Sequence, residues 1–238
     1  MSRPFEVRRE VELPVVPEDV WAAVTTDVAA WQFPSGLDFP ADGSSPGDPV
    51  VTWDPPRLLA IRTEAPDGTF NSLEYEIEAR DGGTARLRYV HAGILADGWE
   101  DQYDAIGAHT DFYLHTMGQY LQHFRGRPVT YVGQPSIGIG ATPEAAGAPD
   151  AMDTLRGALS AKDVGDEVRA EIGARTVEGV VDYATPEFLG IRTADALYRF
   201  FGRNHYGMTV GLSMHAFSIV DADAEEKALQ AWLDGLYA

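Results

Sequence analysis

The chain of 238 residues contains no cysteine. This absence excludes disulfide bonds, thiolate metal sites and cysteine nucleophiles, and it removes any compositional argument for secretion. Long apolar runs are missing too, because none approaches the roughly 18 residues that a membrane-spanning helix needs. Residues 1–6 lack the apolar stretch of a signal peptide. We therefore expect a cytoplasmic protein that is not inserted into a membrane.

Basic residues are scarce. The sequence has 18 Lys and Arg against 37 Asp and Glu, which gives a formal net charge of −19. Such a charge repels nucleic-acid phosphates and anionic membranes, so we expect no nucleic-acid partner. The hydrophobic fraction of 45% is ordinary for a globular protein. The acidic surface is typical of a well-solvated protein, and the alternative is a face that docks a protein partner or a second copy of the chain.

Motifs for nucleotide, metal and hydrolase chemistry are also missing. The segment Gly138-Ile139-Gly140 has Pro143 where a dinucleotide-binding loop needs its third glycine. The sequence has no phosphate-binding Walker loop, no His-Glu-x-x-His helix and no Gly-x-Ser-x-Gly elbow. His109 and His115 would lie about 120° apart on a helix, which favours surface histidines over a metal site. We expect no metal and no cofactor, and no catalytic residue is assigned.

Hydrophobic periodicity predicts a strand, two short helices, a run of antiparallel strands and one long helix. Residues 5–13 alternate apolar and charged side chains, as a half-buried strand does. Pro17, followed by two acidic residues, suits the start of a short helix. Between residues 98 and 124 the large apolar side chains fall within one stripe of a helical wheel about 120° wide, which predicts a long amphipathic helix. A curved sheet wrapped around such a helix leaves a gap where a ligand can sit.

Three short segments resemble the SRPBCC (START-like) superfamily, in the branch named after the activator of the heat-shock-90 chaperone ATPase. Residues 16–24 resemble its entry motif with Pro17 and Trp21. Asp54-Pro55-Pro56-Arg57-Leu58-Leu59 resembles its Pro-Pro turn and strand, and Gly98-Trp99 its entry to the long helix. The resemblance covers residues 5–124. It implies an α+β helix-grip fold, in which a curved antiparallel sheet surrounds a long C-terminal helix and encloses a cavity.

A second, smaller copy of this fold is predicted in the other half of the chain. Residues 180–193 repeat residues 50–63, with seven of 14 positions identical at a constant offset of 130. We interpret residues 1–126 as a helix-grip domain and residues 150–238 as a smaller, degenerate helix-grip-like lobe. Residues 127–149 are then a linker or the first elements of that lobe. The alternative is a single domain with a C-terminal extension of strands.

The candidate ligand-binding residues are polar or aromatic groups on those faces of the predicted strands and long helix whose other side chains form the core. An apolar cavity with a few such groups would orient a ligand that carries a carbonyl, phenol or carboxylate. The other interpretation is that Arg9 pairs with a local acid and that the tyrosines reach the rim with their hydroxyl groups. The candidates are Arg9, Trp53, Tyr75, Tyr89, His91, Trp99, Tyr103, Thr110 and Met117.

Three functions follow from these residues. The first is binding of a small hydrophobic or aromatic molecule in the cavity between sheet and long helix. The second is a cyclase or hydrolase that uses the same cavity, with His91 as general base beside Tyr89 or Arg9. The third is a protein-interaction or stress factor without a ligand. The superfamily members bind lipids or hormones, cyclise polyketides or act in detoxification, so the resemblance does not choose between enzyme and binding protein.

Overall fold

The computed structural model describes the backbone of residues 3–40, 42–95, 99–136 and 138–238, and their side chains except those of 3, 95 and 99–104. The chain divides into two compact units. Unit 1 comprises Met1–Trp31 and Ser35–Arg125, and unit 2 comprises Gln32–Pro34 and Gly126–Ala238. None of the described helices is both long and apolar enough to cross a membrane. Each unit has its own antiparallel sheet and is considered by itself.

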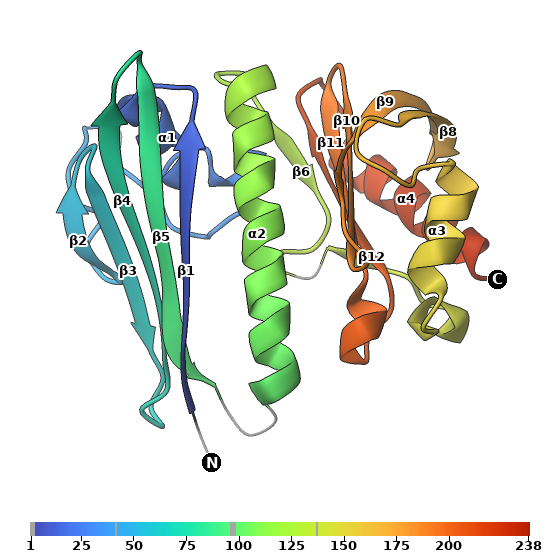
Figure 1. Ribbon diagram of the computed structural model, residues 1–238, viewed down its shortest axis with the longest axis horizontal. Coiled ribbons are helices and arrows are strands. Elements are labelled where there is room, and N and C mark those ends of the chain that lie inside the picture. The colour runs from blue at the N-terminus through green and yellow to red at the C-terminus, as the bar shows by residue number, and fades with distance from the viewer. Residues whose placement is uncertain (1–2, 41, 96–98, 137) are drawn as a thin grey trace. The chain divides into compact units, whose positions relative to one another are not determined.

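Unit 1 is a five-stranded sheet with one long helix on its inner face (Figure 1). The strands run in the order β1-β5-β4-β3-β2, so the first strand pairs with the last. Its elements are β1 (Arg3–Leu13), α1 (Pro17–Val24), a 3-10 helix (Val28–Ala30), β2 (Val50–Asp54), β3 (Leu58–Glu64), β4 (Phe70–Arg80), β5 (Thr84–Leu95) and α2 (Trp99–His123). This is the helix-grip arrangement, and the predicted α+β fold is confirmed.

The two faces of the unit 1 sheet differ as the alternation predicts. Odd-numbered residues point inward, and Val7, Tyr75 and Leu87 are buried there. Even-numbered residues carry the charge: Arg86 of β5 lies 3.1 Å from Glu12 of β1. Exposed pairs of this kind contribute at most about 1 kcal/mol each. They identify the outer face, so the inner face is the one on which a site can form.

Helix α2 approaches β1 closely along a ridge that contains two glycines. A Cβ on Gly118 would lie 3.9 Å from Leu13 Cδ2, and one on Gly107 would lie 3.6 Å from the guanidinium of Arg9. Residues 107 and 118 are three helical turns apart and so share one side of the helix. Met117 and Leu121 are buried on the same helix. The predicted long helix is confirmed, but Phe112 and Thr116, which lie outside its predicted apolar stripe, are buried as well.

Unit 2 connects its strands in a similar order. The first strand, β6, again pairs with the last, β12, in the order β6-β12-β11-β10-β9-β8, and β7 also pairs with β12. Its elements are β6 (Thr130–Val132), β7 (Ile139–Gly140), α3 (Ala151–Leu159), β8 (Glu167–Ile172), β9 (Arg175–Ala184), β10 (Phe188–Thr193), β11 (Ala196–Phe201), β12 (Gly211–Ala216) and α4 (Ala222–Leu236), with 3-10 helices at Glu144–Gly147 and Arg203–Tyr206. Strand β8 has no counterpart in unit 1.

The sequence echo falls on matching hairpins, β2–β3 in unit 1 and β9–β10 in unit 2. Both contain a register shift: one lies between Val50 and Thr52, and the other between Gly190 and Ile191. In the second hairpin Gly190 pairs with Tyr183 and Ile191 with Val181, so Asp182 is the additional residue of a β-bulge. The two hairpins therefore share a sequence pattern and an irregularity in the same strand.

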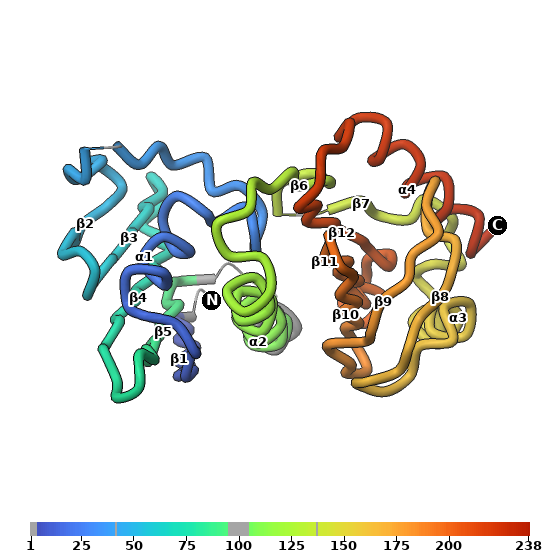
Figure 2. Tube along the Cα trace, turned by 90° about the horizontal axis from the view of Figure 1, so that it is seen from above, coloured from blue at the N-terminus to red at the C-terminus, as the bar shows by residue number. Residues whose placement is uncertain are grey.

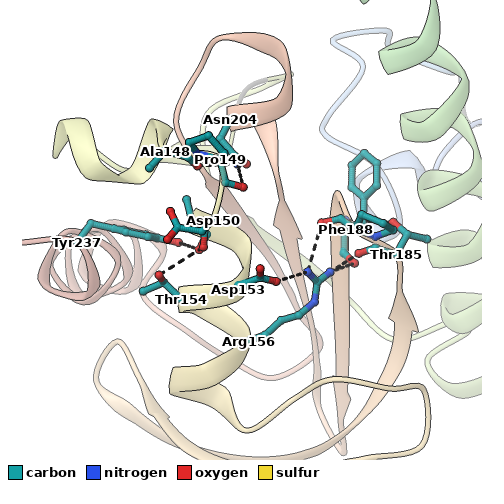
Figure 3. A network of polar contacts seen from close by, with 12 residues as sticks. Ala148, Pro149, Asp150, Asp153, Thr154, Arg156, Thr185, Phe188, Asn204 and Tyr237 are labelled. Atoms are coloured by element: carbon teal, nitrogen blue, oxygen red, sulfur yellow. Dashed lines mark hydrogen bonds and ion pairs between the residues drawn. The ribbon is translucent and has the colours of Figure 1, made fainter.

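Helices α3 and α4 cover one face of the unit 2 sheet (Figure 2). Leu155, Tyr198 and Leu233 belong to the apolar core between them. Polar contacts tie the helices to the loops (Figure 3): Arg156 of α3 donates to the carbonyl oxygens of Thr185 and Phe188, and Tyr237 donates to that of Ala151 at 2.8 Å. These contacts hold α3 to the turn between β9 and β10 and to the residue that follows α4.

Two strands of unit 2 are shorter than the sequence predicts. The sequence pattern predicts strands over residues 164–172 and 208–217, whereas the strands begin at Glu167 and Gly211. Asp166 stabilises a turn before β8, because its carboxylate accepts hydrogen bonds from the backbone N–H groups of Lys162 and Asp163. The 3-10 helix Arg203–Tyr206 ends in a left-handed Gly207 before the second. In both cases a local turn delays the start of the strand.

Candidate functional site

Four of the predicted site residues lie in one row across the inner face of the unit 1 sheet. The strand register places Trp53 opposite Leu59, Leu59 opposite Tyr75, Tyr75 opposite Tyr89 and Tyr89 opposite Arg9. Neighbouring strands are about 4.8 Å apart, so this row crosses the whole sheet. His91 lies in the next row, opposite Val7. The alternation therefore placed these residues on the correct face.

Arg9 is held by a carboxylate of the long helix. Its Nε and Nη2 both donate to the carboxylate of Asp111, the second at 2.9 Å, and Nη1 donates to the carbonyl oxygen of Arg8 at 2.9 Å. The pair is half-exposed, with 36% and 43% of the two side chains accessible. A bidentate pair fixes the guanidinium in one orientation. Arg9 thus links β1 to α2, as the pairing interpretation of this residue predicts.

The two tyrosines of the row are buried and protonated. Their ring centroids lie 5.2 Å apart, and only 4% of Tyr75 and 7% of Tyr89 is exposed. Burial raises the pKa of both hydroxyl groups above the ordinary value, and a hydrogen bond joins the Tyr89 hydroxyl to the side chain of Thr110 on α2. Tyr89 and Thr110 therefore form a second link between sheet and helix, and neither tyrosine can act as an anion at neutral pH.

His91 is a neutral imidazole paired with an amide. Its Nε2 lies 2.6 Å from Asn71 Oδ1 of β4. Because an amide oxygen only accepts, this nitrogen carries the hydrogen and the other, Nδ1, is an acceptor. Burial lowers the pKa of His91 to about 4. The ring also makes an edge contact with Phe5, at a centroid distance of 5.0 Å.

An open pocket of about 390 Å³ lies beside His91, at the end of the sheet where β5 ends and α2 follows. Phe5 of β1, Ile94 of β5 and Ile106 of α2 form apolar walls, and Phe70 closes it from β4. Phe70 is itself covered by Arg62, whose guanidinium carbon lies 3.8 Å from the ring centroid. None of the nine lining residues carries a charge at neutral pH, since the pKa of His91 is about 4.

The other predicted residues lie apart from this pocket. Trp53 belongs to an aromatic cluster: it contacts Trp21 edge-on at 4.9 Å and stacks on Phe39 at 5.8 Å. Its indole N–H donates to the carbonyl oxygen of Gly43. Met117 is fully buried in the core. The side chains of Trp99 and Tyr103 lie outside the described part of the chain.

Sequence reasoning missed Phe5, Asn71 and Ile106 as wall residues. Phe5 could have been found, since the alternation of β1 places it on the inner face with Arg9. Asn71 comes next to His91 only through the register of β4 and β5, in which Leu73 rather than Asn71 lies opposite His91. Ile106 belongs to the apolar stripe of α2 and looks like a core residue in sequence. Among the described residues, no group of three His, Asp or Glu side chains could hold a metal ion.

Comparison with known proteins finds similarity in structure but not in sequence. No protein-family model matches the chain. No curated protein matches it. Among solved structures, DynU16, described as a protein of the dynemicin biosynthetic locus, is 14% identical with a TM-score of 0.36; the match covers 98% of this chain and 95% of DynU16. An AHSA1 protein of Silicibacter pomeroyi is 20% identical with a TM-score of 0.35, over 50% of this chain and 98% of its own. A Mesorhizobium loti protein is 17% identical with a TM-score of 0.40, over 50% and 98%.

Proposed function

We propose that unit 1 binds a small, neutral, largely apolar or aromatic molecule that carries one hydroxyl group. The observation that supports this proposal is the uncharged pocket beside His91, with Phe5, Ile94 and Ile106 as walls. Apolar surface removed from water contributes about 25 cal/mol per Å², so these walls favour an aromatic or aliphatic body. A charged ligand would lose its hydration without gaining a counter-ion.

The pair His91–Asn71 would orient the hydroxyl group. Nδ1 of His91 accepts and the Asn71 amide nitrogen donates, because Nε2 and Oδ1 already satisfy each other. A hydroxyl group can donate to the first and accept from the second. We propose a structural role for Tyr89 and Thr110 rather than contact with the ligand, since they hold sheet and helix together. Contact with the ligand is proposed for His91, whereas the candidates Arg9, Trp53, Tyr75 and Met117 do not line this pocket.

The same geometry supports binding over acid–base catalysis. A histidine whose pKa is about 4 is a weak base, Tyr89 already shares its hydroxyl with Thr110, and Arg9 is paired with Asp111. The three groups of the enzyme hypothesis are therefore each engaged elsewhere. A cyclase or hydrolase in this pocket would need a base of higher pKa.

A matched pair of ligands tests the proposal. Displacement of the neutral fluorescent probe N-phenyl-1-naphthylamine would be measured with naphthalene and with 1-naphthol, which differ only in a hydroxyl group. We expect 1-naphthol to bind about fivefold to tenfold more tightly, as one hydrogen bond predicts, and His91→Phe to remove this preference. Ile106→Lys should abolish probe binding, whereas Ala108→Lys on the same helix should not. Unchanged probe affinity in Ile106→Lys would refute the site.

A further inference from the structure

Polar side chains of the unit 1 pocket come from three strands that are neighbours in the sheet. His91 belongs to β5, Asn71 to β4 and Thr63 to β3, and all three line the pocket. The apolar walls described above come from β1, the end of β5 and α2. A bound molecule therefore meets hydrogen-bonding groups of the sheet on one side and apolar surface on another.

Thr63 lies directly opposite Asn71 in the pairing of β3 with β4. Side chains that face each other across an antiparallel pair are on the same face of the sheet, with their Cβ atoms roughly 5 Å apart. The oxygen of the Asn71 amide is turned toward His91 on β5. The amide nitrogen is on the other branch of the same planar group, so it points away from His91 and remains a donor for a ligand.

The hydroxyl group of Thr63 is available to a bound molecule. The residue is exposed, and its hydroxyl group makes no hydrogen bond within the described part of the chain. The other threonine of the pocket differs, because the Thr69 hydroxyl donates to Asp67 Oδ1 at 2.7 Å and the backbone N–H of Thr69 donates to the same oxygen at 3.0 Å. Thr69 is thus committed to the turn between β3 and β4, whereas Thr63 is not.

Two hydrogen-bonding positions on one face of the sheet restrict the shape of the ligand. A hydroxyl group held by His91 and Asn71 places a second oxygen next to Thr63 if the two oxygens are roughly 5 Å apart, the spacing of facing side chains. Both oxygens must also lie on the edge of the molecule that faces the sheet. On an aromatic ring, oxygens on adjacent carbons are too close together, and oxygens at opposite ends point in opposite directions. Oxygens in a 1,3 relationship meet both requirements.

We propose that the ligand of unit 1 contains a 1,3-dioxygenated aromatic ring, whose hydroxyl group binds His91 and Asn71 and whose second oxygen, such as that of an ether, accepts a hydrogen bond from Thr63. This inference rests on the function proposed for unit 1 and narrows it to a class of ligand. Thr63 is then a specificity-determining residue, because it selects the position of the second oxygen. The second oxygen is neutral, since the lining residues offer no counter-ion.

Ligand pairs that differ only in the second oxygen test this assignment with the full chain. 3-Methoxyphenol and 3-ethylphenol have nearly the same shape, but the second has a methylene group in place of the ether oxygen. Their dissociation constants would be measured by displacement of N-phenyl-1-naphthylamine. Thr63→Val should weaken 3-methoxyphenol relative to 3-ethylphenol by about threefold to tenfold, the value of one hydrogen bond. The same substitution should leave the ratio for 4-methoxyphenol and 4-ethylphenol unchanged.

Two further variants serve as controls. Thr63→Ser keeps the hydroxyl group and should retain the original ratio. Thr69→Val removes a hydroxyl group that Asp67 already engages, so it should retain the ratio as well. An unchanged melting temperature would verify that Thr63→Val folds normally.

The outcomes separate this inference from the proposed function. If the phenols displace the probe and His91→Phe weakens them, but Thr63→Val leaves the ratio unchanged, the inference is overturned and the proposed function stands. An equal change of the ratio in Thr69→Val would overturn the inference too. If none of the phenols displaces the probe, the proposed function fails and the inference fails with it.

Discussion

Arg9 of β1 and Asp111 of α2 form a bidentate ion pair although they are 102 residues apart in sequence. The pair lies at the middle of the ridge where Gly107 lets the helix approach the strand. Together with the bond between Tyr89 and Thr110, it fixes the distance between sheet and helix. That distance sets the width of the interior next to the pocket.

The first prediction concerns this pair. Asp111→Asn should lower the free energy of unfolding by about 1 kcal/mol at low salt and by less at high salt, because the pair is half-exposed and screened. Urea denaturation of Arg9→Met, Asp111→Asn and the double variant measures the coupling. Glu6→Gln, which removes the partner of the more exposed Arg8, should change stability by less than about 0.5 kcal/mol. Strict additivity of the two single changes would contradict a coupled pair.

The second prediction concerns a buried ion pair in unit 2. Arg199 and Asp182 meet at 2.9 Å through both oxygens, with 1% and 4% of their side chains exposed. A Cβ on Gly190 would overlap Asp182 Oδ1 and Arg199 Nη1. Gly190→Ala should therefore cost about 3 kcal/mol or more, since it separates two buried charges.

Calorimetric unfolding would measure this loss, with Gly157→Ala in α3 as the control. Nothing lies within 4 Å of a Cβ at Gly157, so that change should stabilise the helix by about 0.5–1 kcal/mol. A Gly190→Ala protein as stable as the original would show that the ion pair does not depend on this glycine.

The third prediction is a pH dependence due to His91. Its pKa of about 4 in the fold is below the ordinary value of 6.5, so the unfolded chain binds more protons between these values. The contribution of His91 to the free energy of unfolding is fully present above pH 6.5. It is lost as the pH falls toward 4, by at most about 3 kcal/mol. Denaturation at a series of pH values should show a shallower acid loss in His91→Phe. The exposed His205→Gln should retain the original slope, and equal slopes in all three proteins would refute the assignment.

The fourth prediction concerns the wall of the unit 1 pocket. A Cβ on Gly93 would lie 2.6 Å from Phe5 Cε1 and 2.6 Å from the carbonyl oxygen of Phe70. The carbonyl belongs to the backbone of the neighbouring strand, so the ring of Phe5 must move into the pocket. Gly93→Ala should destabilise unit 1 by about 1–3 kcal/mol. It should also weaken the binding of N-phenyl-1-naphthylamine to the pocket. Gly235→Ala, which has open space around it, should do neither.

Alternation and helical periodicity were sufficient to predict the inner face of unit 1. They placed Tyr75, Tyr89 and His91 inward because a strand has a side-chain period of two. The turn at Asp81-Gly82-Gly83 also fixes how β4 pairs with β5. The pairing of β1 with β5 joins segments far apart in sequence, and no turn defines its register. The contact of Phe5 with His91 and Gly93 depends on that register, so the pocket wall could not be predicted.

The buried charges of unit 2 escaped prediction for a related reason. All six residues of β11 (Ala196–Phe201) are buried, so no alternation distinguishes the buried charge of Arg199 from its apolar neighbours. Its partner Asp182 is the additional residue of a β-bulge, and a bulge interrupts the alternation on which the prediction rests. Neither the bulge nor the space left by Gly190 has a signature in composition or periodicity.

Strand β2, finally, is an outer strand of the unit 1 sheet and has consequences for handling the protein. Its segment Val50-Val51-Thr52-Trp53 carries no charge, favours β-structure and leaves 59% of Val51 exposed. Such an edge can recruit a strand from another molecule and begin aggregation. Pro49 and Asp54-Pro55-Pro56 flank it as gatekeepers, since proline cannot extend a hydrogen-bonded ladder and like charges repel. Replacing these flanking residues would be expected to reduce solubility before it affected the unit 1 pocket.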